Sequence, residues 1–303
     1  MRQAANRVFI EGILSENNLE YGSFVKDGKT VEVIRGYVTV RVPQIVSGKL
    51  VTCEIQVHGF AQKTKKNGDP NPAYVSLDAV KNDFVSIASC GSEEGADRVR
   101  ISSAEIRMNE FVGRNGQQVS YPRVTASFIN KVGKDKFNPK ATFEIEMFVA
   151  GHDYELDNEG NEKIDADGNK RYIVTGIVPQ YNGAVDVIKF VCSNDNVATN
   201  VQDYWEANST VKAIGVLNFI STTETVVEQV GFGDPIEKQR TISKTDLVIT
   251  GGSDVPLDGE LAYSVEDIQK GLAERKQRLE ALKNKQSTKQ APAPGISAND
   301  LGF

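Results

Sequence analysis

Histidine, cysteine and tryptophan are scarce in this chain of 303 residues. There are two histidines (His58 and His152), three cysteines and one tryptophan. So few histidines argue against most zinc enzymes and most catalytic triads built on histidine. Cys53, Cys90 and Cys192 form no Cys-x-x-Cys motif and cannot all pair with one another, which favours a reduced, cytoplasmic protein.

Long apolar runs are missing as well. No window of about 18 apolar residues exists, so the sequence predicts no membrane helix, and its first residues lack the apolar stretch of a secretory signal. Nucleophile-elbow, phosphate-loop and zinc-protease motifs are also absent. These absences argue against an enzyme and against a bound cofactor.

Two acidic segments, 157–160 and 165–169, superficially suggest calcium loops. The spacing of an EF-hand fails here, because Gly168 comes too early and position 176 is not a glutamate. An Asp-Gly sequence between two strands is better explained by a long hairpin tip. We therefore expect no metal site.

Charge is divided unevenly along the chain, although the net charge is only −6. Residues 1–140 contain 20 Lys and Arg against 15 Asp and Glu, whereas residues 141–260 contain 8 against 21. A polyanionic partner is therefore expected on the first half. The acidic half is expected to repel phosphates at short range, so we predict that it does not touch a nucleic acid directly.

Alternating apolar residues dominate the first 260 positions. In the first half, strand-like segments cover 8–14, 30–42 and 50–60, and strands return at 97–108 and 120–132 around an Asn-Gly turn. Between them, Leu77, Val80 and Phe84 follow a helical period after Ser76, a candidate N-cap.

The second half repeats this order. Strand-like segments at 141–149, 171–178 and 184–192 precede a helical stretch around Val201 and Trp205, and further strands follow at 210–219, 225–232 and 241–250. Three strands, a helix and two strands describe an OB-fold barrel. The sequence thus predicts a mainly β protein with two small OB-fold-like barrels, each with one helix. One larger β-sandwich with helical inserts remains open.

A third region follows the two repeats. Residues 264–286 predict a helix capped by Ser264, with Tyr263 packing on Ile268 and an apolar stripe that includes Leu279. The Pro-, Ala- and Ser-rich segment 287–303 predicts a disordered tail. The expected domains are therefore 1–140, basic and OB-like; 141–260, acidic and OB-like; and 261–303, a helix and a flexible tail.

The layout resembles bacterial and phage single-stranded DNA-binding proteins. Their N-terminal strand motif is matched by Asn6–Leu14 (NRVFIEGIL), and their fourth and fifth strands by the segment from Arg98 to Phe128. The family's acidic, apolar tail tip is matched by Asn299–Phe303 (NDLGF). With a single acid in the tail and an acidic second half, the chain resembles a divergent, phage-type member more than the usual bacterial one. The resemblance implies single-stranded DNA binding in replication or recombination, and protein partners recruited through Asp300, Leu301 and Phe303.

Binding single-stranded DNA requires cations along the phosphates and flat side chains for the bases. Arg35, Tyr37 and Arg41 share one face of a predicted strand, with valines on the opposite face, although simple exposed alternation gives the same pattern. Phe111 is either a core residue or an exposed stacker. The candidate DNA-binding residues are Lys26, Lys29, Arg35, Tyr37, Arg41, Lys63, Lys65, Lys66, Arg98, Arg100, Arg107, Phe111, Tyr121 and Arg123.

Two function classes therefore compete. The first is a non-enzymatic, non-sequence-specific single-stranded DNA-binding protein of a phage-type system, with its binding surface in residues 1–140. The second is a β-rich virion or assembly protein without affinity for nucleic acid. The basic first half and the tail favour the former, and whether the chain forms a homo-oligomer is left open.

Overall fold

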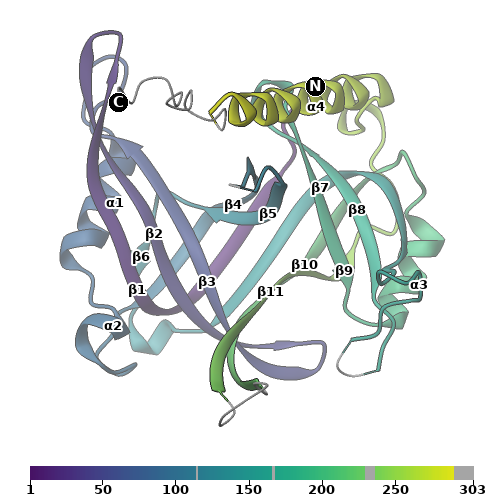
Figure 1. The fold of residues 1–303 in the computed structure, drawn as a ribbon, viewed down its shortest axis with the longest axis horizontal. Coiled ribbons are helices and arrows are strands. Elements are labelled where there is room, and N and C mark those ends of the chain that lie inside the picture. Colours follow the sequence, from purple (N-terminus) through teal and green to yellow (C-terminus); the bar gives the residue numbers. More distant parts are fainter. Residues whose placement is uncertain (114, 166–167, 229–235, 290–303) are drawn as a thin grey trace, which may run out of the picture.

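Two small β-barrels lie side by side in the computed structural model of this chain, and a long helix crosses above them in the view of Figure 1. The structure describes residues 1–113, 115–165, 168–228 and 236–289. Within these ranges, no helix combines the length and apolar character needed to span a membrane.

The first barrel is closed by pairing among β1, β2, β3, β4 and β5. β1 pairs with β2 and β4, β2 pairs with β3, and β4 pairs with β5. A short parallel contact between β3 and β5, centred on Val57 and Val124, completes the ring. The elements are β1 (Asn6–Lys26), β2 (Lys29–Val46), β3 (Lys49–Gln62), α1 (Pro72–Asp83), α2 (Ile87–Cys90), β4 (Arg98–Val112), β5 (Gln118–Thr125) and β6 (Asn130–Lys131).

The second barrel repeats the same connectivity. β7 pairs with β8 and β10, β8 pairs with β9, and β10 pairs with β11. A parallel contact between β9 and β11, at Val191 and Val248, closes this ring in the same way. The elements are β7 (Lys140–Tyr154), β8 (Tyr172–Pro179), β9 (Val185–Cys192), α3 (Asp195–Tyr204), β10 (Thr210–Glu228), β11 (Ile236–Gly252) and α4 (Val265–Lys289), with 3₁₀ turns at Lys134–Lys136, Tyr181–Gly183 and Gly259–Leu261.

These pairings confirm the predicted fold class of two OB-fold-like barrels followed by a helix. Even a local irregularity repeats, since β1 shifts its register against β2 between Leu14 and Glu16, and β7 shifts against β8 between Val149 and Gly151. Trp205, at the end of α3, is buried, and its indole N–H donates to the Ser253 carbonyl at 2.7 Å. α4 extends to Lys289, so the helix continues three residues into the predicted disordered tail, and the rest of that tail, 290–303, lies outside the described residues.

The helix of the first barrel begins earlier than its sequence period suggested. Asn71, rather than Ser76, is the N-cap, because its side chain accepts the N–H of Ala73 and Pro72 occupies the first helical turn. α1 ends at Asp83, and a separate short helix follows Ser86, which caps it through Ser89. The single helical period of the sequence is thus divided between α1 and α2.

The barrels are joined along their first strands. β1 and β7 run antiparallel from Asn6↔Ile145 to Glu11↔Lys140, so the two repeats meet about an approximate two-fold axis. On the other edge of the same β1 segment, Val8 pairs with Ala104 of β4. The first half of β1 is therefore enclosed between the two barrels, which makes the eleven-strand sheet continuous.

Glu11 fixes the connection between the barrels from within this junction. Its side chain is 1% exposed and accepts hydrogen bonds from Arg100 Nε and from the Asn138 N–H, both at 2.6 Å. Burial alone would raise the pKa of Glu11, but these hydrogen bonds outweigh it and hold the pKa below its usual value. The ionised carboxylate thus anchors the segment that leads into β7.

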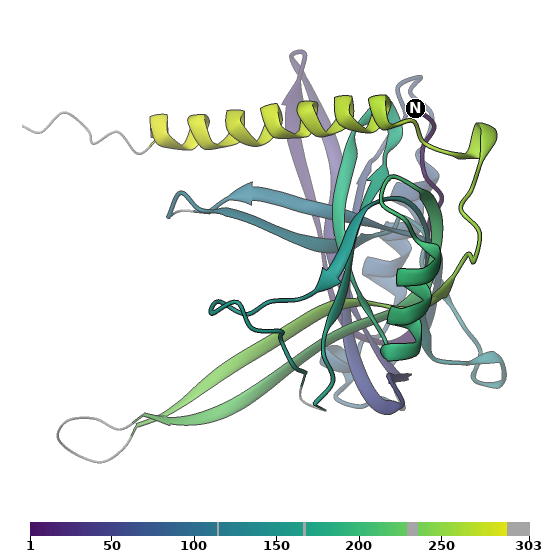
Figure 2. The same cartoon turned by 90° about the vertical axis from the view of Figure 1, so that its right-hand side faces the viewer.

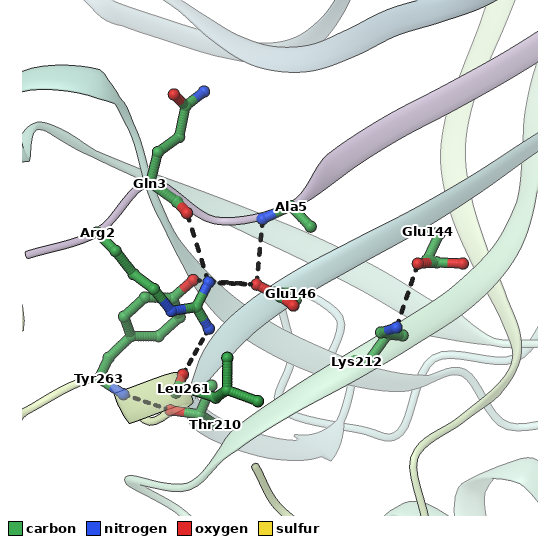
Figure 3. Close-up of polar contacts among 9 residues, drawn as sticks. All are labelled: Arg2, Gln3, Ala5, Glu144, Glu146, Thr210, Lys212, Leu261 and Tyr263. Atoms are coloured by element: carbon green, nitrogen blue, oxygen red, sulfur yellow. Dashed lines mark hydrogen bonds and ion pairs between the residues drawn. The ribbon is translucent and has the colours of Figure 1, made fainter. Parts of the chain in front are cut away.

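The end of the second barrel is tied back to the N-terminus by the contacts of Figure 3. Arg2 Nη1 donates to Glu146 Oε2 at 2.6 Å, and the Arg2 guanidinium lies 4.6 Å from the ring centroid of Tyr263. The Tyr263 N–H donates to Thr210 Oγ1 at 2.9 Å. Tyr263 and Ile268 are both buried, as predicted, so the chain enters α4 from a fixed point.

α4 is held against the first barrel by one carboxylate. The Glu110 side chain is 2% exposed and pairs with Arg275 and, at 2.7 Å, with Arg278, both on the helix. Nearer the N-terminal end of α4, Gly271 lies so close to Val185 of the second barrel that an added Cβ would come within 2.6 Å of the valine side chain. Residues of α4 therefore pack on both repeats, as the position of the helix in Figure 1 shows.

We expect the double variant Arg275→Ala/Arg278→Ala to lose about 3 kcal/mol of unfolding free energy, because it leaves the buried Glu110 carboxylate without its cations. The variant Arg275→Ala/Arg278→Ala/Glu110→Gln should recover part of this loss, since it no longer buries an unpaired charge. Chemical denaturation of the three proteins at neutral pH measures the difference. Equal stability of the double variant and the wild type would contradict the role of this contact.

Candidate nucleic-acid interface

A shallow groove follows the outer face of β2, β3 and β5 in the first barrel. It consists of three adjoining depressions of about 450, 540 and 630 Å³, each lined by both His58 and Arg123. Cross-strand register explains the grouping, because Tyr37 lies opposite His58 and Arg35 lies opposite Phe60. We call this surface the β2–β3 groove.

Aromatic side chains are available for stacking at one end of the groove. Phe60 on β3 is 55% exposed, and Phe128, just after β5, is 45% exposed. Tyr37 is half-buried beside His58, with ring centroids 5.5 Å apart and planes tilted by 51°. Apolar rings exposed to this degree on a concave surface can present their faces to a planar ligand.

His58 is an uncharged member of the groove. Burial and, to a smaller extent, the positive charge of Arg123 together lower the pKa of His58 to about 4. The imidazole is therefore neutral near pH 7 and contributes a flat ring, not a cation.

Two arginines supply positive charge at the groove. Arg123 is half-buried, and its Nε has no hydrogen-bond partner among the described residues. Arg35 is exposed, and the described part of the chain offers it no ion pair. Unpaired guanidinium groups beside exposed rings can bind phosphate without first breaking an internal contact.

Two glycines allow this part of the barrel to pack closely. Gly36 adopts a φ of +136°, which a side chain rarely tolerates, and an added Cβ would lie 2.1 Å from the Asn18 carbonyl oxygen. Opposite it, an added Cβ on Gly59 would approach the Leu77 side chain to 2.9 Å. α1 can therefore pack directly beneath the strand segment that bears His58 and Phe60.

The β4–β5 hairpin carries the other predicted aromatic pair. Phe111 and Tyr121 are 41% and 40% exposed and meet edge to face at 6.3 Å, so the structure supports the exposed alternative for Phe111. Tyr121 also lines the groove. Figure 2 shows this hairpin extending from the same side of the molecule as the β10–β11 hairpin, below α4.

Several predicted cations are neutralised by internal ion pairs. The partners are Glu54 at 2.6 Å and Glu93 at 2.8 Å for Arg41, Glu32 at 2.8 Å for Lys63, and Glu105 at 3.7 Å and Asp186 at 4.0 Å for Arg107. Arg41 still lines the groove, whereas Lys63 and Arg107 lie outside it.

The remaining predicted cations lie away from the groove. Arg98 and Arg100 are on β4, where Arg98 lies over the Phe137 ring at 5.4 Å and Arg100 binds Glu11. Lys26 and Lys29 face each other at the end of the β1–β2 hairpin, and Lys65 and Lys66 are exposed in the loop after β3. The structure therefore collects Arg35, Tyr37, Arg41, Tyr121 and Arg123 on one surface and distributes the other nine elsewhere.

Sequence reasoning missed His58, Phe60 and Phe128. The first two were visible as residues of a predicted strand, and they share parity there. The register of β3 against β2 places His58 and Phe60 beside Tyr37 and Arg35, and that register cannot be deduced from one sequence. Phe128 follows the end of β5, where period-two alternation no longer applies.

On the second barrel, the corresponding face, formed by β8, β9 and β11, carries charged side chains that pair with one another. Arg171 binds Glu155 at 2.6 Å and Asp246 at 3.0 Å, and the Arg171 and Asp246 side chains are 13% and 15% exposed. Arg275 of α4 lines the same region, together with residues of the β4–β5 hairpin. Among the described residues that line it, this face has neither the exposed rings nor the unpaired arginines of the β2–β3 groove.

The first acidic segment considered as a calcium loop, 157–160, forms a turn. The Asp157 carboxylate accepts the N–H groups of Asn161 and Glu159, both at 2.9 Å, and these bonds lower the pKa of Asp157. In the described ranges, no group of three or more His, Cys, Asp or Glu side chains is arranged to hold a metal ion. The predicted partner residues Asp300, Leu301 and Phe303 lie outside the described residues.

Comparison with known proteins gives a family and a set of similar folds. A family model described as YorF matches residues 4–285, so the chain belongs to the YorF family. Among curated proteins, no sequence matches.

Solved structures similar to this one include the single-stranded DNA-binding protein of Thermus aquaticus. Its wild type aligns with a TM-score of 0.47 and 11% identity over 88% of this chain and 99% of that one, and a deletion variant with 0.47 and 10% over 88% and 100%. A replication protein A heterotrimer bound to single-stranded DNA gives 0.19 and 10% over 93% and 70%. At such identity, the chemistry of the site depends on this chain's own residues.

The lowered pKa of His58 allows a test of whether its side chain is buried in the folded protein. Because the folded-state pKa of about 4 lies below the usual value of 6.5, folding favours the neutral ring. This contribution is fully present above about pH 6.5 and is lost as the pH falls toward 4. In denaturant titrations across this window, His58→Gln should reduce the pH slope of the unfolding free energy by up to one proton. Parallel slopes for variant and wild type would show that His58 is solvated.

Proposed function

We propose that this protein binds single-stranded DNA without sequence preference through the β2–β3 groove of its first barrel. One observation carries the proposal: exposed or half-buried rings from β2 and β3 and the segment after β5 share a concave surface with the unpaired Arg35 and Arg123. Rings stack on any base and arginines bind any phosphate, so this combination suits a strand of arbitrary sequence.

The shape of the groove also favours a single strand of nucleic acid over a small ligand. The three depressions adjoin and remain open, and the residues they share lie in the middle of the path. An extended polymer can occupy all three at once, whereas a small molecule would use one. OB-folds also bind oligonucleotides with the face formed by their second and third strands.

The proposed biological setting is phage-type DNA replication or recombination. It is supported by the resemblance of the N-terminal strand and of the segment from Arg98 to Phe128 to phage and bacterial single-stranded DNA-binding proteins. No catalytic step is needed for this role, because the protein would act by covering exposed strands. Its specificity would come from the accessible base faces that a duplex hides.

We expect Phe60→Ala and Phe128→Ala each to weaken binding of a fluorescent oligo-dT by about 1–3 kcal/mol, because each removes a stacking surface. Tyr181→Ala is the matched control. Tyr181 is 72% exposed but lies on the second barrel, outside the groove, so its loss should leave affinity unchanged. Fluorescence anisotropy at constant salt provides the comparison.

The salt dependence of the same titration provides a second readout. Log affinity should fall with log salt with a slope of about −0.7 per phosphate contact, and the slope should become shallower in Arg123→Ala. Absence of oligonucleotide binding at low salt would refute the proposal and favour the alternative of a β-rich assembly protein.

A further inference from the structure

The groove of the first barrel has a wall that comes from the second barrel. The β10–β11 hairpin leaves its own barrel and reaches β2 and β3, where the Leu217 carbonyl accepts a hydrogen bond from Gln44 Nε2 at 2.6 Å. The side-chain oxygen of the same residue, Gln44 Oε1, accepts the Ala141 N–H at 2.7 Å. Gln44 is buried and satisfied at both ends, so the hairpin is fixed in one orientation.

Beyond this anchor, the hairpin lines the depression of about 450 Å³, which Arg41 and His58 of the first barrel also line. The wall residues are Phe219, Ile220, Ser221, Ser243, Lys244 and Thr245. Ser221 and Ser243 are directly paired in the β10–β11 register, and both are exposed. Figure 2 shows the hairpin extending far from the body of its own barrel.

The chemistry of this wall differs from that of the half to which it belongs. Residues 141–260 carry many more acids than bases, yet none of the six wall residues is acidic. Lys244 is 45% exposed, and its partner Asp246 is already engaged by Arg171. Hydroxyl groups and a cation are the side chains that most often bind phosphate oxygens.

We propose that a single strand bound in the β2–β3 groove also contacts the β10–β11 hairpin at Ser243 and Lys244, so that both barrels bind the same strand. The strand would pass from the exposed rings of Phe60 and Phe128, across His58 and Arg123, and leave between Arg41 and Lys244. This inference rests on the proposed function. It replaces the expectation that the acidic half stays clear of the nucleic acid.

Charge placed at Ser243 tests this path in the full-length protein. Ser243→Glu should weaken oligo-dT binding at least about threefold, and Ser243→Lys should strengthen it and steepen the salt slope by about 0.7. Thr250→Glu and Thr250→Lys are the controls, because Thr250 is exposed on the same strand but lies outside the groove. They change net charge equally and should alter affinity less than twofold.

The outcomes separate the two proposals. If the wild type binds oligo-dT and the Ser243 and Thr250 variants behave alike, the hairpin is not part of the path and the inference fails, while the proposed function stands. If the wild type does not bind at all, the proposed function fails first. Opposite shifts for Ser243→Glu and Ser243→Lys, with flat Thr250 controls, support contact with the hairpin.

Discussion

The antiparallel pairing of β1 with β7 is the contact on which the rest of the arrangement depends. It joins two closed barrels along their first strands, so neither has an open edge at that point. In the approximate two-fold arrangement that follows, the β4–β5 hairpin of the first barrel lies against the second barrel. The equivalent β10–β11 hairpin of the second barrel lies against the first. Hence Gln44 of the first barrel can anchor β10, and Arg275 of α4 can reach the β8–β9 face.

Alternation along the sequence was enough to predict the barrels and one face of the site. Val38, Val40 and Val42 are fully buried, and Arg35 and Tyr37 lie on the opposite face, as period-two spacing requires. The repeat of three strands, a helix and two strands gave the OB-fold because the order of elements limits the topology.

Pairing between distant segments could not be predicted in this way. Arg41 looked like a free cation, but cross-strand register places Glu54 opposite it and the loop after α2 brings Glu93 to its other side. Likewise Arg100 meets Glu11 only because β1 lies beside β4. A charged residue's availability depends on its neighbours in space, which one sequence does not specify.

The two barrels present corresponding faces that differ in chemistry. Where the first barrel presents rings and unpaired arginines, the second holds Arg171 between Glu155 and Asp246 and is overlain by the β4–β5 hairpin and α4.

The enclosed position of the first half of β1 also bears on how the chain reaches its native state. Val8 must pair with Ala104 on one side and Phe143 on the other, so β1 depends on segments that are synthesised much later. Such high contact order slows folding, because the entropy of closing long loops is lost before the contacts form. Until β4 and β7 emerge, the apolar face of Val8 and Ile10 stays without its final partners. A chaperone that covers nascent strands would be most useful to this protein during that interval.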